Sequence, residues 1–145
     1  MSLTTAFDAD VLVYAAAKGH PLGTRVAALF TDAGATPVGT GSVLLLAEVL
    51  TKPMRTDPES DETAALVSLL SRLELQPLDG STARLALALA VSYGLRAADS
   101  VHLATAVAAG ADRFLTNNRK DFPPTITEID VAYPDELPLV ASALE

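Results

Sequence analysis

The chain has 145 residues, half of them hydrophobic, which suits one domain with a substantial core. It has no cysteine, so disulfides and thiolate metal sites are excluded. The formal net charge of −8 argues against a strong, indiscriminate nucleic-acid binder, because such binding rests on Lys and Arg at phosphates. The acidic residues therefore either form a solvated surface or converge on a bound cation.

Targeting segments, apolar stretches and cysteine content together indicate the compartment in which we expect the protein. The N-terminal segment lacks a basic stretch followed by a long apolar run, so we expect no signal peptide. The longest apolar stretches, such as Val43–Ala47, are too short to span a bilayer. The absence of cysteine is compatible with a reducing compartment. We therefore expect a cytoplasmic protein without a membrane partner.

The first half of the chain alternates between short strands and helices. Apolar spacing, proline and glycine breaks, and capping residues define these elements. In chain order they are a strand at Thr4–Phe7, a helix at Val11–Ala17, a break at His20–Gly23, a helix at Thr24–Ala33 closed by Gly34, a strand at Thr36–Gly39, a helix at Val43–Leu50 capped by Ser42, and an exposed loop at Lys52–Ser60.

The second half continues the same alternation. We predict a helix that starts at Ser60 and Thr63 and runs to about Leu73, a strand at Leu75–Leu78, a helix at Ser81–Ser92 stopped near Gly94, a helix at Ala97–Ala109 closed by Gly110, a strand at Arg113–Thr116, a loop at Asn117–Pro124, a strand at Ile126–Val131 and a terminal helix at Pro134–Leu144. Strands alternating with helices of about 10–15 residues favour a mainly parallel sheet covered on both faces, in one domain spanning residues 1–145.

Several segments place carboxylates or amides just after predicted strands. In open parallel α/β folds, functional groups gather at the carboxyl ends of the strands, so we expect these side chains at one sheet edge. They are Asp8 and Asp10 after the first strand, Glu48 in the helix after the second, Asp99 at the start of a later helix, and Thr116, Asn117, Asn118 and Asp121 after the fourth.

Carboxylates gathered in this way need a compensating charge. Their pKa values rise and some protonate unless a cation lies among them. The motifs contain no obvious basic partner apart from the nearby Arg96 and Lys52. A hard divalent cation such as Mg²⁺ prefers oxygen ligands and can acidify a water for attack on a phosphodiester.

Other reactive arrangements find little support. The chain has only two histidines, His20 and His102, so a zinc site would need an unusual ligand set. No nucleophile-elbow sequence surrounds any serine. The glycine-rich Gly39–Ser42 is neither a Walker A sequence nor a dinucleotide fingerprint.

Four segments, in this order and covering residues 4 to about 131, resemble the motifs of PIN domains. They are Phe7–Tyr14, Ser42 with Glu48-Val49-Leu50, Leu95–Ala106 and Thr116–Phe122. The resemblance implies a three-layer α/β/α sandwich with a central, mainly parallel sheet of about five strands, and a Mg²⁺- or Mn²⁺-dependent nuclease site. Small stand-alone PIN domains are often VapC-type toxins that cleave RNA and are silenced by an antitoxin, and family members often form homodimers.

The resemblance also assigns roles to individual residues. Asp8, Glu48 and Asp99 match the acidic, metal-binding positions of the family. The fourth position stays open, because Asn118 stands where some members have an acid and Asp121 lies three residues further on. If neither supplies a charge, three acids remain. A substrate or supporting role is expected for Asp10, Ser42, Thr116, Asn118 and Arg119.

Each of these residues also has a purely structural interpretation. Asp8 and Asp99 could cap helices, and Glu48 could lie on an exposed helix face. His102 is interpreted as a packed, hydrogen-bonded core histidine rather than a ligand. Arg119 could hold an RNA phosphate or lie in a solvated loop, as could Lys120, Lys52 and Arg55.

The sequence thus favours a metal-dependent endoribonuclease whose catalytic and metal-binding residues are Asp8, Glu48, Asp99 and Asp121. Two alternatives remain open. One is a catalytically degenerate domain that binds RNA or protein, and the other is a different metal-dependent phosphoester hydrolase.

Overall fold

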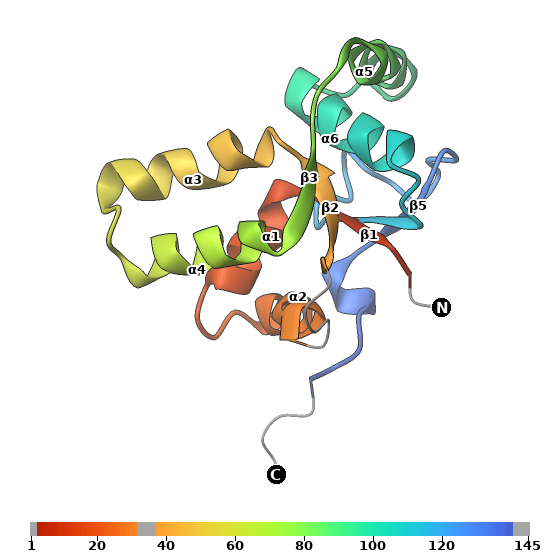
Figure 1. The fold of residues 1–145 in the computed structure, drawn as a ribbon. Coiled ribbons are helices and arrows are strands. Elements are labelled where there is room, and N and C mark those ends of the chain that lie inside the picture. Colours follow the sequence, from red (N-terminus) through yellow and green to blue (C-terminus); the bar gives the residue numbers. More distant parts are fainter. Residues whose placement is uncertain (1–2, 32–36, 141–145) are drawn as a thin grey trace.

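The computed structural model describes residues 3–31 and 37–140. In this part of the chain five strands form one parallel sheet, with the order β3-β2-β1-β4-β5 (Figure 1). The strands are β1 (Thr5–Phe7), β2 (Gly39–Ser42), β3 (Leu73–Gln76), β4 (Arg113–Leu115) and β5 (Asp130–Ala132). Strand β1 lies in the centre, and the chain leaves it first toward β2 and later returns to its other side at β4.

Helices cover both faces of this sheet, as predicted (Figure 1). Helices α1 to α4 pack on one face, and α5 and α6 pack on the other. Their bounds are α1 (Ala9–Ala16), α2 (Pro21–Thr31), α3 (Leu45–Thr56), α4 (Asp61–Ser71), α5 (Gly80–Tyr93) and α6 (Ala97–Ala108), followed late in the chain by a 3₁₀ turn, η1 (Pro134–Glu136). No helix in residues 3–31 or 37–140 combines the length and apolar character needed to cross a membrane.

The central strands contribute side chains to two separate apolar clusters. Successive side chains of a strand point to opposite faces of the sheet. Phe7 and Leu115 accordingly join the cluster under α1 to α4, whereas Ala6 and Phe114 join the cluster under α5 and α6. All four are buried. This alternation confirms the three-layer sandwich.

Local capping signals act where the sequence places them. The Ser60 hydroxyl accepts a hydrogen bond from the backbone N–H of Thr63 at 3.1 Å and begins α4. Helix α5 ends at Gly94, which adopts a left-handed φ of 66°. Gly110 likewise has a φ of 72° after α6. The predicted boundaries of α4, α5 and α6 are therefore confirmed within two residues.

Two strands lie away from their predicted positions. Strand β2 occupies Gly39–Ser42 rather than Thr36–Gly39, and Thr36 lies outside the described residues. A Cβ on Gly39 would lie 2.2 Å from the Thr5 carbonyl oxygen, and one on Gly41 would lie 2.5 Å from Leu45 Cδ1. Glycine is therefore required here by close packing, which outweighs its low strand propensity. Strand β3 similarly starts two residues before the predicted Leu75.

The predicted loop Lys52–Ser60 is wrong in its first half. Helix α3 continues to Thr56 with Pro53 inside it, and only the segment from Asp57 to Ser60 forms the connection to α4. Proline removes a single helical hydrogen bond. The packing of α3 against α4 retains the helix despite that loss.

The predicted break at His20–Gly23 is also wrong. Helix α2 begins at Pro21, which suits the first helical position because its missing N–H would have no partner there. His20 Nδ1 accepts hydrogen bonds from the N–H groups of Leu22 and Gly23 at 3.2 and 3.1 Å. Gly23 is buried against α1. The predicted cap at Gly34 lies outside the described residues.

The C-terminal part differs as well. The predicted strand Ile126–Val131 is reduced to β5, and the predicted helix Pro134–Leu144 is reduced to η1. Leu137 precedes Pro138, and a residue before proline is disfavoured in the α-region. Residues after Val140 lie outside the described part of the chain.

Candidate metal centre

The candidate centre lies where the direction of strand order reverses. Strand β1 pairs with β2 on one side and with β4 on the other, and the carboxyl end of such a strand is where ligands bind in open α/β folds. Asp8 follows β1 directly, and Thr116 follows β4. Because parallel strands end at the same edge, segments far apart in the sequence meet here.

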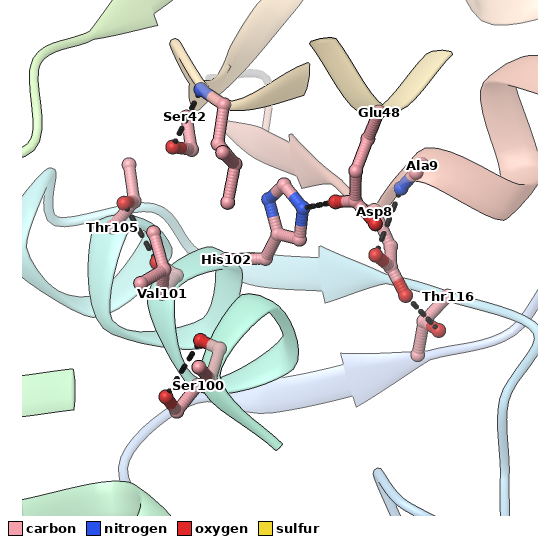
Figure 2. Close-up of polar contacts among 11 residues, drawn as sticks. Asp8, Ala9, Ser42, Glu48, Ser100, Val101, His102, Thr105 and Thr116 are labelled. Atoms are coloured by element: carbon pink, nitrogen blue, oxygen red, sulfur yellow. Dashed lines mark hydrogen bonds and ion pairs between the residues drawn. The ribbon is translucent and has the colours of Figure 1, made fainter. Parts of the chain in front are cut away.

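Asp8 is the most deeply buried acid of the centre. Its Oδ1 accepts a hydrogen bond from the N–H of Ala9 at 2.8 Å, and its Oδ2 accepts one from the hydroxyl of Thr116 at 2.7 Å (Figure 2). Burial raises the pKa of Asp8, and the charge of Glu48 adds to this rise, while the His102 ring and the two hydrogen bonds oppose it. Asp8 thus caps α1 and carries a charge that burial disfavours.

Asp10 lies one residue inside α1. Its Oδ2 accepts the backbone N–H of Asn117 at 3.0 Å, whereas its buried Oδ1 has no hydrogen-bond partner within residues 3–31 and 37–140. The Asn117 side chain also donates to the Tyr14 hydroxyl at 3.3 Å. Burial, followed by the charge of Asp8, raises the pKa of Asp10 to about 7. An unpaired buried carboxylate oxygen of this kind is expected beside a cation.

Asp99 approaches the same point from the first turn of α6. It is partly buried, and burial is the largest cause of its raised pKa. The charges of Asp8 and Asp121 raise the pKa further, and only the neighbouring Arg96 lowers it appreciably. Asp8 and Asp121 therefore each lie within electrostatic reach of Asp99, as expected for segments that meet at one sheet edge.

Asn118 and Asp121 form a reciprocal pair in the loop after β4. The Asn118 side-chain amide donates to Asp121 Oδ2 at 2.9 Å, and the Asp121 N–H donates to Asn118 Oδ1 at 3.1 Å. The Asn118 N–H also donates to the Thr116 hydroxyl at 3.1 Å. Of the two residues left open by the sequence, Asp121 carries the charge that acts on Asp99, and Asn118 orients it.

Glu48 reaches the centre from α3 and is hydrogen-bonded to a histidine. Its Oε1 accepts a hydrogen bond from Nε2 of His102 on α6. Figure 2 shows the Glu48 carboxylate between the His102 ring and Asp8. The prediction that His102 is a packed, hydrogen-bonded histidine is confirmed. Its partner was not predicted, although His102 lies one helical turn beyond Asp99 on the same face, which points it toward the acids.

Two predicted residues do not face the acids. The Arg119 guanidinium pairs with Asp135 at 2.5 Å and lies 4.0 Å above the centre of the Tyr133 ring, so it is directed toward η1. The Ser42 hydroxyl accepts the N–H of Leu44 at 3.0 Å, and α3 begins only at Leu45. Ser42 thus forms the turn into α3 instead of capping a helix that starts at Val43.

The acids suit a hard divalent cation by their chemistry. They supply only oxygen ligands, and their charges are mutually unfavourable without a counterion. However, no three acidic or histidine side chains in the part of the chain that the structure describes are grouped so that they could hold a metal ion as they stand. A metal ion shared by three of these side chains would need them to rotate toward one another, and Asp99 is a partly exposed member of the group.

A groove opens beside Glu48. It has a volume of about 410 Å³ and lies between α1, α3 and α4. Its charged residues are Glu48, Lys52, Asp57 and Glu62, and Val13, Val49 and Leu66 are among its apolar residues. The groove therefore joins an apolar surface to the edge of the acidic cluster.

The parallel sheet, the helical layers on both faces and the carboxylates at the carboxyl edge define a three-layer α/β protein with an acidic centre. The family model of the PIN domain matches residues 6–123, and the chain belongs to this family. A comparison with curated proteins gives no match.

Solved structures share this fold at low sequence identity. A toxin–antitoxin complex from Klebsiella pneumoniae contains a chain with 22% identity and a TM-score of 0.69, over 90% of this chain and 97% of that one. VapBC2 from Rickettsia felis, bound to a DNA fragment from its promoter, gives 20% identity and a TM-score of 0.69, over 90% and 98%. DNA-bound VapBC from Salmonella typhimurium gives 18% identity and a TM-score of 0.66, over 92% and 99%.

Proposed function

We propose that this PIN domain is a Mg²⁺- or Mn²⁺-dependent endoribonuclease and the toxin of a VapC-type toxin–antitoxin pair. The observation that supports it most is the set of carboxylates whose pKa is raised by burial and by one another's charges, together with an unpaired, buried oxygen of Asp10. Such an arrangement is costly without a cation, and perturbed carboxylates of this kind gather at functional sites.

In this proposal Asp8, Glu48, Asp99 and Asp121 hold the ion. When bound, the ion supplies an acidified water and neutralises charge on the phosphate. The remaining polar groups orient the acids. Thr116 holds Asp8, and Asn118 holds Asp121, each through a direct hydrogen bond.

The substrate must approach an acidic protein, so few phosphate contacts are expected. Lys52 lies on α3 one turn beyond Glu48, and Lys120 lies in the loop beside Asp121. Arg119 is engaged with Asp135 and is not part of this set. RNA cleavage should therefore depend weakly on salt, with a shallow slope of binding against salt concentration.

The proposed protein partner is an antitoxin. The solved structures with this fold include toxin–antitoxin complexes at comparable chain length. The groove between α1, α3 and α4 offers apolar contact next to the proposed centre, so a partner seated there would also obstruct substrate.

The test compares Asp8→Asn and Asp99→Asn with the unmodified chain on RNA, in Mg²⁺ and in EDTA. We expect each variant to lose at least about 100-fold in cleavage rate, because several kcal/mol of metal-based charge stabilisation disappear. Asp130→Asn is the matched control, since it removes the same formal charge from an exposed position on β5. Cleavage that persists in both variants and in EDTA would refute the metal mechanism.

A second candidate is a catalytically inactive domain that binds RNA or protein. It is favoured by the finding that no three acids or histidines in the described residues are gathered as a ready-made metal site. Calorimetry separates the two, because an inactive binding module should show no heat of binding with millimolar Mg²⁺ or Mn²⁺, whereas a metal-dependent nuclease should show one.

A further inference from the structure

His102 occupies an unusual place for a polar ring. Its side chain is only 1% exposed, and the next residue of α6 is the fully buried Leu103. Its Nε2 donates to Glu48. Its Nδ1 is buried and has no hydrogen-bond partner among the residues that the structure describes.

Packing alone does not account for this ring. A buried nitrogen without a partner is unfavourable, and an apolar side chain of similar volume would fill the same space without that cost. The next two residues of α6, Leu103 and Ala104, are both apolar and completely buried. Among the described residues the ring is hydrogen-bonded to Glu48 and interacts favourably with the charge of Asp8, so the reason for a histidine here lies in its contact with the acids.

The contact restricts the Glu48 side chain, which would otherwise be mobile at the surface. This side chain is 37% exposed and sits on α3, where a free glutamate would sample several rotamers. The histidine binds only Oε1, which leaves Oε2 without this constraint. The carboxylate is placed between the His102 ring and Asp8 (Figure 2). His102 also follows Asp99 by one helical turn, so one helix positions two of the acids.

We propose that His102 is a positioning residue that holds Glu48 by one carboxylate oxygen and presents the other oxygen to the cation shared with Asp8 and Asp99. This inference rests on the proposed function, because it concerns the same metal centre. Hydrogen-bonded partners of ligating carboxylates orient the ligand and tune metal affinity. His102 is not itself a ligand, since one nitrogen is engaged by Glu48 and the other is enclosed in the core.

The experiment measures Mn²⁺ affinity of the full chain by titration, with free Mn²⁺ followed by electron paramagnetic resonance. His102→Leu removes the donor and keeps an apolar filling, and we expect affinity to fall about 10-fold. His102→Gln carries an amide donor and should recover most of that loss. Thr105→Val is the matched control, because Thr105 is also buried on α6 and its hydroxyl donates to the Val101 carbonyl of the same helix. It should leave the affinity unchanged.

Two further variants test whether His102 acts through Glu48. Glu48→Gln should weaken Mn²⁺ binding, and adding His102→Leu to it should cause no further loss, because the two residues act as a unit. In the metal-free protein, Glu48→Ala should speed solvent exchange of the His102 Nε2 proton at least about 10-fold, seen by NMR, since that proton loses its acceptor. This readout uses an exposed position and does not depend on the folding of His102→Leu.

The outcomes separate the two proposals. If the unmodified chain binds Mn²⁺ and His102→Leu binds it equally well, the positioning role is refuted and the proposed function stands. If the unmodified chain binds no Mn²⁺, both fail. Unchanged exchange of the Nε2 proton in Glu48→Ala also overturns the inference.

Discussion

Asp10 should make the metal-free protein less stable as the pH rises. Burial and the charge of Asp8 raise its pKa from 3.8 to about 7. Because the folded protein holds this proton more tightly than the unfolded chain, the favourable contribution is present below about pH 4 and is lost as the pH rises through about 7. Asp10→Asn removes the titrating group and should flatten this dependence.

The size of the effect follows from the shift in pKa. One pKa unit corresponds to about 1.4 kcal/mol, so a shift of about three units sets a ceiling of about 4 kcal/mol at high pH. Between about pH 4.5 and about pH 8 the difference between the unmodified chain and Asp10→Asn should change by about 3 kcal/mol. The asparagine can still accept the Asn117 N–H, but its amide occupies the place of the unpaired Oδ1, which costs about 1–3 kcal/mol at every pH.

Urea unfolding in EDTA at these two pH values measures the difference. Asp130→Asn serves as the control, since it removes the same formal charge from an exposed strand end. Millimolar Mg²⁺ should stabilise the unmodified chain at high pH more than it stabilises Asp10→Asn, because a cation offsets the unpaired carboxylate. If the stability of the unmodified chain and that of Asp10→Asn change with pH in parallel in EDTA, the assignment of an unfavourable buried charge to Asp10 is wrong.

Two substitutions test the packing and the polar support of the centre. A Cβ at Gly23 would lie 1.9 Å from the Tyr14 carbonyl oxygen, so Gly23→Ala should push α1 and α2 apart. We expect this variant to lower the free energy of unfolding, measured by urea titration, by about 1–3 kcal/mol. In the control Gly80→Ala the new Cβ meets the end of the Arg84 side chain, so stability should be unchanged or slightly higher. Thr116→Val keeps the side-chain shape but removes the hydrogen bond that lowers the pKa of Asp8, so Mn²⁺ affinity at neutral pH should fall about 10-fold. An unchanged affinity would mean that Thr116 does not support Asp8.

Short-range signals in the sequence are sufficient for much of the fold. A capping hydroxyl such as that of Ser60 bonds an N–H three residues away, and a glycine such as Gly94 ends a helix through its own φ. These interactions act within one turn, so the residues that make them are adjacent in the sequence. The placement of Asp8 after a central strand and of Asp99 at a helix start follows from the same local patterns.

Contacts between residues far apart in the sequence decide the remaining features, and no local sequence pattern predicts these contacts. Strand β2 contains Gly39 because the Thr5 carbonyl leaves no room for a Cβ there, and α3 continues through Pro53 because α4 packs against it. Arg119 is directed toward η1 because it pairs with Asp135 and lies over the Tyr133 ring. The bond between Glu48 and His102 joins residues 54 positions apart. Such contacts depend on which segments the folded sheet brings together, which a linear pattern of residue types does not record.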